Sequence, residues 1–258
     1  MTNCERLLRE IASFSNLWKG GYYEGDPLNP MSISSYGVLG YISSLYAIYL
    51  TCIKPYINEN SVVCEIGCGR GAWTKTFLNA KEVWCLDVLS AEHNIFWEYV
   101  GHHDHVKYCQ INDFSCEMLP ENKFNYIFSF GCFCHISFEG ITEYMKNLFP
   151  KLLPGTHGFI MIADYDKFNN AKAKEYEYIY QILPVKLRPI FKIYNGIESF
   201  FRPNEFHDKN ENNTISPGRW YHAGIDRTCE MLCKFNYDIV EADVNANIRD
   251  PIIHFIKP

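Results

Sequence analysis

The sequence predicts an α/β protein built on one doubly wound sheet that is mostly parallel. From residue 61 onward, seven short apolar runs alternate with segments of helical character or, near the end, follow each other without a helix. The runs lack strict alternation of apolar and polar residues, which is typical of strands covered on both faces. Because the last two runs are joined directly, we expect one edge strand to be antiparallel.

The predicted elements follow in order along the chain. The strands are 61–67, 82–88, 106–111, 124–130 and 158–164, separated by helices at 72–78, 91–100 and 140–153, and a helix at 226–234 precedes strands at 237–244 and 250–258. In the third helix Ile141, Tyr144 and Leu148 recur at helical spacing. Pro150 and Pro154 mark its end.

Composition argues against some classes of function. The net charge of −6 over 258 residues disfavours a nucleic-acid partner, whose phosphates require clustered Lys and Arg. The first ten residues are polar, and the apolar stretch 37–53 is interrupted by Ser43 and Ser44, so we expect no signal segment and no membrane span. The 11 cysteines are irregularly spaced and odd in number, which favours reduced, buried thiols and a cytoplasmic protein.

A glycine turn follows the first strand, with Gly67, Gly69 and Gly71 at every second position. A strand-to-helix turn without side chains lets a ligand reach free N–H groups, although a plain tight turn has the same glycines. Asp87 ends the next strand, where an acid accepts hydrogen bonds from ribose hydroxyls. Glu65 lies directly before the turn, which disfavours a pyrophosphate and suits a ligand with an amino group. The pattern favours a cationic nucleoside without phosphates over a dinucleotide.

Four motifs together carry a resemblance to a known family. "VVCEIGCGRG", "WCLDV", "CQINDF" and "FNYIFSFGCFCHI", in this order, resemble the successive motifs of class I S-adenosylmethionine-dependent methyltransferases. The resemblance implies a Rossmann-like sheet of seven strands with an antiparallel last strand, and S-adenosylmethionine as cofactor. More loosely, "SFGCFCHI", "GGYYEGDPLNPMSISSYG" and "RDPIIHFIKP" are similar to methyltransferases of bacterial surface-polysaccharide pathways, which modify sugars or their phosphoramidate groups.

The resemblance also implies which residues contact the cofactor. They are Glu65, Gly67, Cys68 and Gly69 at the methionine end, Asp87 at the ribose, Asn112 and Asp113 at the adenine edge with Phe114 or Leu89 on its face, and Phe130 and Gly131 beside the sulfonium. Arg70 departs from this pattern because its cation would oppose the sulfonium. We expect it to face solvent or to pair with an acid.

Methyl transfer to a hydroxyl requires a base near the acceptor. His135 follows the fourth strand and is the first candidate; a helix-capping or internal hydrogen-bonding role is the alternative. Asp164 closes the fifth strand and is the second candidate, with a capping role as its alternative. His222 is the third. A divalent ion held by Asp164, Asp166 and Asn169 is weighed, but we expect no metal.

Aromatic and basic residues are candidates for acceptor binding. Tyr22, Tyr23 and Tyr36 lie in a Gly/Pro-rich loop, and Arg219, Trp220 and Tyr221 precede the last helix; all six form our predicted acceptor site, with packing against the core as the alternative. Arg188, Lys192 and Arg202 form an anion site or a solvated helix face. Cys132 with Cys134, and Cys229 with Cys233, lack a zinc-site spacing and are expected to be buried.

The whole chain, 1–258, is expected to form a single methyltransferase domain. It comprises an N-terminal helical cap (1–56), a cofactor-binding core (57–164), a substrate-cap insert (165–221) and a final helix with closing strands (222–258). The predicted activity is O-methylation of a small polar acceptor in surface-polysaccharide biosynthesis. The alternatives are an NAD-dependent or nucleotide-sugar oxidoreductase, an N-methyltransferase of a small metabolite, and a non-catalytic binding protein. The expected partner is the small-molecule acceptor, and a homodimer is allowed for.

Overall fold

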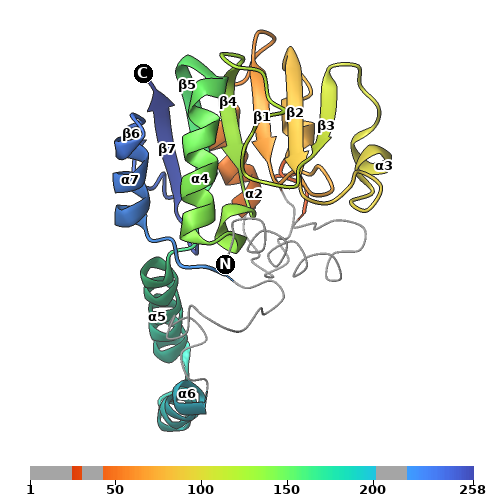
Figure 1. Ribbon diagram of the computed structural model, residues 1–258. Coiled ribbons are helices and arrows are strands. Elements are labelled where there is room, and N and C mark those ends of the chain that lie inside the picture. Colours follow the sequence, from red (N-terminus) through yellow and green to blue (C-terminus); the bar gives the residue numbers. More distant parts are fainter. Residues whose placement is uncertain (1–24, 31–42, 202–219) are drawn as a thin grey trace.

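The computed structural model describes residues 25–30, 43–201 and 220–258, with the backbone alone over 195–201 (Figure 1). A seven-stranded sheet forms its centre, in the order β3-β2-β1-β4-β5-β7-β6. The strands are β1 (Val62–Ile66), β2 (Glu82–Asp87), β3 (Val106–Gln110), β4 (Phe124–Ser129), β5 (Leu152–Met161), β6 (Asp238–Glu241) and β7 (Ile252–Lys257). The predicted fold class is therefore confirmed.

The antiparallel strand lies inside the sheet rather than at its edge. β1 to β5 pair in parallel, whereas β7 runs antiparallel to both β5 and β6 and lies between them. Composition explains this order, since β7 is mostly apolar and almost wholly buried, while β6 carries Asp238 and Glu241 and is largely exposed. An interior strand has to be apolar on both faces, and an edge strand does not.

Helices cover both faces of the sheet (Figure 1). α4 (Phe138–Leu148) lies on one face, and α2 (Ser44–Ile48) lies on the other. The predicted helix 140–153 ends early because a 3-10 turn containing Pro150 follows it and β5 already begins at Leu152. The predicted helices 72–78 and 91–100 are also shorter, as the 3-10 helix Thr74–Phe77 and α3 (Phe96–Val100).

Alternating side chains divide the core into two layers. Val62, Cys64 and Ile66 of β1 pack on the face covered by α4, whereas Val63 packs on the opposite face. Glu65 shares the face of Val63, where it meets the 3-10 helix that follows the glycine turn. The strand alternation therefore directs this carboxylate inward, beneath the turn.

The insert after β5 extends away from the sheet (Figure 1). It contains α5 (Tyr165–Ile182) and α6 (Arg188–Phe201), and α7 (Ile225–Lys234) then returns to the side of the sheet near β6. Within the described residues neither α5 nor α6 packs along another element. No helix among these residues is both long and apolar enough to cross a membrane.

Candidate active site

The glycine turn requires glycine both for its backbone and for its packing. Gly67, Gly69 and Gly71 all have positive φ, at 74°, 52° and 95°. A Cβ atom on Gly67 would lie 2.3 Å from Cβ of Cys132, and one on Gly71 would lie 2.2 Å from a methyl of Val100. At Gly67 and Gly71 the turn after β1 is therefore pressed against neighbouring segments, which leaves no room for a side chain at these two positions.

Asp87 fixes the shape of this turn. One of its carboxylate oxygens accepts a hydrogen bond from the backbone N–H of Gly69 and the other accepts one from Leu89, each at 2.9 Å. Burial raises the pKa of Asp87, and these two N–H groups oppose that shift. As a carboxylate, Asp87 can accept hydrogen bonds from ribose hydroxyls, and it also holds the turn.

Glu65 is buried beneath the same turn, with 2% of its surface exposed. Its Oε2 accepts a hydrogen bond from Thr74 Oγ1 at 2.6 Å, and the Cys85 thiol approaches the same atom at 3.7 Å. Burial raises the pKa of Glu65 to about 8, against the opposing effect of these two donors. A cationic group placed beside Glu65 would favour its ionised form, and the predicted methionine amino group is such a cation.

Space for a ligand exists at the end of β4. Gly131 has a φ of 72°, and a Cβ atom on it would meet no atom within 4 Å. The half-buried Phe130 ring packs 5.0 Å from the ring of Trp73. The glycine turn, Asp87 and the open position at Gly131 therefore fit the predicted cofactor. Cys68 is buried, so it can contribute only its backbone.

The predicted adenine residues differ in exposure. Asn112 and Asp113 are exposed, and Asp113 accepts hydrogen bonds from the backbone and hydroxyl of Ser115. Phe114 is 3% exposed and packs 5.6 Å from the Tyr144 ring in the core layer under α4. The half-buried Leu89 is therefore the better candidate for contact with the adenine face.

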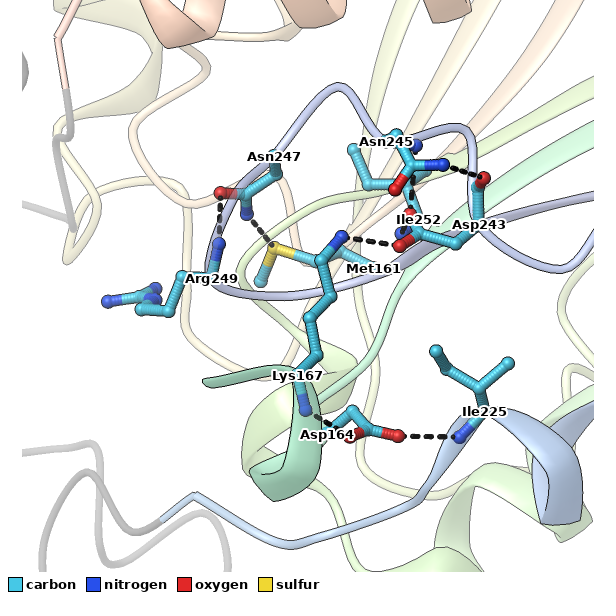
Figure 2. Close-up of polar contacts among 9 residues, drawn as sticks. All are labelled: Met161, Asp164, Lys167, Ile225, Asp243, Asn245, Asn247, Arg249 and Ile252. Atoms are coloured by element: carbon cyan, nitrogen blue, oxygen red, sulfur yellow. Dashed lines mark hydrogen bonds and ion pairs between the residues drawn. The ribbon is translucent and has the colours of Figure 1, made fainter. Parts of the chain in front are cut away.

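The three candidate bases have different surroundings. His135 ends a 3-10 helix directly after β4, and its ring lies 6.2 Å from that of Trp220. Asp164 accepts a backbone hydrogen bond on each oxygen, from Lys167 at 2.8 Å and from Ile225 at 2.9 Å, so it caps both α5 and α7 (Figure 2). His222 Nδ1 accepts a hydrogen bond from the backbone N–H of Tyr165 at 3.0 Å. The proton of a neutral His222 ring is therefore on Nε2.

The segment before α7 joins the ends of β4 and β5. Tyr221 donates its N–H to the carbonyl of Cys134 at 2.9 Å, and the Tyr165 hydroxyl donates to the carbonyl of Trp220 at 2.5 Å. The Arg249 guanidinium lies 3.8 Å from the Trp220 ring centre. Tyr22, Tyr23, Tyr36, Arg202 and Arg219 lie outside the described residues.

A polar pocket of about 820 Å³ adjoins two of the candidate bases. Its lining includes Asp164, Lys167, His222, Arg227, Asp243 and Asn247, but none of the predicted cofactor residues. Lys167 forms an ion pair with Asp243 across it (Figure 2). The pocket is therefore separate from the predicted cofactor residues.

Several contributors at this site were missed by sequence reasoning. Thr74, Lys167 and Arg249 reach their partners only through the folded chain, and no local pattern identifies them. Among the described residues, no three His, Cys, Asp or Glu side chains gather to hold a metal ion. None of the four cysteines of the two pairs forms a disulfide; Cys134 is buried as expected, and Cys233 is exposed, against expectation.

Comparisons with known proteins bear on the fold and the family. A family model described as a methyltransferase domain matches residues 41–212, which is more than half of the chain. No protein of curated function matches the sequence. Among solved structures, an S-adenosylmethionine-dependent methyltransferase from Listeria monocytogenes is similar, with TM-score 0.53, 14% identity, and coverage of 83% of this chain and 98% of that one.

Two further solved structures are similar at the level of the fold. The N-methyltransferase NodS from Bradyrhizobium japonicum, in complex with S-adenosyl-L-homocysteine, has TM-score 0.50, 14% identity, and coverage of 83% and 85%. A methyltransferase solved in complex with its activator from Haloferax volcanii has TM-score 0.51, 12% identity, and coverage of 83% and 88%.

Proposed function

Because the chain belongs to the methyltransferase-domain family, we propose that it methylates an oxygen of a small polar acceptor with S-adenosylmethionine as donor. The acceptor class is a sugar, a nucleotide-activated sugar or a phosphoramidate group of bacterial surface-polysaccharide biosynthesis, in the cytoplasm. The observation that carries the proposal is the pair of buried carboxylates, Glu65 and Asp87, on either side of the glycine turn.

This pair favours the donor over a dinucleotide. A pyrophosphate at the turn would disfavour the ionised form of both acids, whereas an ammonium group would favour ionised Glu65 and ribose hydroxyls would complement Asp87. Asp87 would hold the ribose, Glu65 the amino group, and the position beside Gly131 the reacting end. The bound cofactor would supply a methyl group already activated on a sulfonium.

The remaining task of the protein is to position the acceptor and to remove its proton. We favour His135 as the base, because it follows β4 directly, where the resemblance places groups near the transferred methyl, and because its ring lies 6.2 Å from that of Trp220. His135 would take the hydroxyl proton of an acceptor held beside the bound donor. In this proposal Asp164 and His222 position the chain around the site.

The acceptor would lie against Trp220 and Tyr221, near His135. Trp220 is half-buried and held at its carbonyl by Tyr165, so its ring has a fixed place. Tyr22, Tyr23, Tyr36 and Arg219 remain proposed acceptor contacts, as does the division of the chain into cap, core and insert. The pathway rests on the sequence likeness of the motifs.

Calorimetry tests the donor assignment. S-adenosylhomocysteine should bind to the full chain, and NAD should give no heat; the reverse result would reject the proposal. A methyl-transfer assay against nucleotide-activated sugars, free sugars and phosphoramidates, followed by mass spectrometry, then tests the acceptor class. A methylated amine as the only product would replace the O-methyl proposal with N-methylation.

A further inference from the structure

The end of the α5–α6 arm exposes an unusual amount of apolar surface. We call residues 178–194 the arm tip. It carries eight of the twelve exposed large apolar side chains that the structure describes: Tyr178, Tyr180, Ile182, Val185, Leu187, Ile190, Ile193 and Tyr194. Their exposed fractions run from 39% at Tyr180 to 72% at Val185. Apolar patches of this kind on a folded protein mark interaction surfaces.

The charge of the arm tip is opposite to that of the chain. Residues 178–194 contain Lys186, Arg188 and Lys192 and no acid, whereas the whole chain has a net charge of −6. The nearest acids along the sequence are Glu177 and Glu198. A partner surface that complements the arm tip is therefore anionic.

The tip has a defined local structure. Arg188 donates hydrogen bonds to the carbonyls of Gln181, at 2.8 Å, and Leu183, at 3.1 Å, which close the turn between the helices. On α6, Ile190, Ile193 and Tyr194 follow the spacing of one helix face. These exposed aliphatic and Tyr side chains are interspersed with the cations of the tip.

Aliphatic residues, tyrosines and cations on one element fit a lipid–water interface. Aliphatic side chains enter the acyl boundary, Tyr rings occupy the head-group level, and Lys or Arg contact anionic head groups. A second copy of the chain fits less well, because a symmetric contact would bring the cations of both tips together. We propose that the arm tip docks the protein on the surface of an anionic membrane.

Vesicle sedimentation with the full chain tests this proposal. The protein should sediment with phosphatidylcholine vesicles that contain phosphatidylserine and not with phosphatidylcholine alone, and added salt should weaken binding. Each cation at such a surface contributes roughly fivefold to binding. The double variant Lys186→Gln/Lys192→Gln should therefore bind on the order of 25-fold more weakly.

Matched variants separate the tip from charge in general. Lys54→Gln/Lys81→Gln makes the same change in net charge at exposed sites outside the tip and should bind as the unchanged protein does. Ile190→Ser/Ile193→Ser should lose vesicle binding, whereas Met118→Ser, at an exposed site elsewhere, should keep it. Absence of vesicle binding by the unchanged protein, or equal loss in the control variants, would overturn the proposal.

Two further measurements identify other occupants. Light scattering after gel filtration should give the same mass for the unchanged protein and for Ile190→Ser/Ile193→Ser. A dimer that this variant dissociates would make the tip a self-association surface and overturn lipid docking. Binding of S-adenosylhomocysteine should be the same in all tip variants, so lipid docking and the proposed activity can fail independently.

Discussion

At the glycine turn two carboxylates are buried, whereas at the arm tip large apolar side chains are exposed. Both arrangements oppose the usual preference of these groups for water or for the core. At the turn, hydrogen bonds from Thr74 and from two backbone N–H groups hold the acids in place. At the tip, no described element covers the apolar groups. The comparison is consistent with the two proposals, a small-ligand site at the turn and a docking surface at the arm tip.

Replacing His135 by alanine should have the largest effect on turnover. It tests whether methyl transfer takes place at the candidate active site. Turnover should fall on the order of 100-fold or more, because the proposed base is lost. The Kd of S-adenosylhomocysteine should not change, as measured by calorimetry. His102→Ala, at an exposed site, is the matched control. Retained turnover in the His135 variant would move the role to Asp164 or His222.

Gly67→Ala breaks the turn itself. The new Cβ would clash with Cys132 at 2.3 Å and would be strained at a φ of 74°, so we expect a loss of about 3 kcal/mol in the free energy of unfolding. Gly155→Ala is the matched control, because its φ is 79° but a Cβ meets no atom within 4 Å. It should cost about 1 kcal/mol in urea denaturation. Equal losses would refute the close packing of the turn.

Asp87→Ala separates ligand binding from folding. Loss of a charged acceptor for the ribose should weaken S-adenosylhomocysteine roughly 10- to 100-fold. The unfolding free energy should fall by only about 1 kcal/mol, as the N–H groups of Gly69 and Leu89 lose their acceptor. Asp238→Ala, on the exposed edge strand, should change neither quantity. Unchanged affinity would remove Asp87 from the ribose.

The raised pKa of Glu65 predicts that the affinity for the cofactor depends on pH. With its pKa raised to about 8 by burial, the free protein must release a proton before Glu65 pairs with the ammonium group. Affinity for S-adenosylhomocysteine should therefore rise with pH, by roughly tenfold per unit between about pH 6 and 8. In Glu65→Gln, calorimetry should find a weaker and flatter profile. A steep profile in this variant would exclude Glu65 as its source.

The same raised pKa affects folding with a defined sign. Between the ordinary value of 4.5 and about 8, Glu65 is ionised in the unfolded chain and protonated in the folded one. Its contribution therefore lowers stability as pH rises through this window. The Glu65→Gln variant should lack that contribution in urea titrations.

The smallest expected effect is at the arm tip. Ile190→Ser should change the free energy of unfolding by less than about 0.5 kcal/mol, because Ile190 is already 64% exposed. The same substitution at Ile160, which is fully buried in β5, should cost about 3 kcal/mol or more. A large loss at Ile190 in urea denaturation would mean that the tip is packed within the chain.

The sequence was informative where local patterns decide structure. Apolar runs located all seven strands within a few residues, except that β5 begins six residues before its predicted start. The glycine turn, with Glu65 and Asp87 beside it, could be predicted because these residue types and their spacing are local; their contacts with the cofactor remain a prediction. The sequence shows that the last two strands are joined directly, but it does not show which of them lies inside the sheet. The interior position of β7 depends on the relative burial of β6 and β7.

Long-range contacts explain the rest of what was missed. The carboxylate of Asp164 joins the first turns of α5 and α7, which are far apart in the chain. Arg249 reaches Trp220 from the segment before β7. Phe114 follows the third strand as expected, but the packing of Tyr144 on α4 draws it into the core. Such pairings depend on which elements meet, and a single sequence does not report that.

The length of α5 limits how far the arm tip can lie from the sheet. This helix has 18 residues, or about 27 Å at 1.5 Å per residue, and its N-cap is Asp164, shortly after the end of β5. A bilayer touched by the far end of the arm would stand off from the reaction centre by up to that distance. At that full separation an acceptor would have to be freely diffusing or attached to a long tether, because one lying flat among the head groups would be out of range.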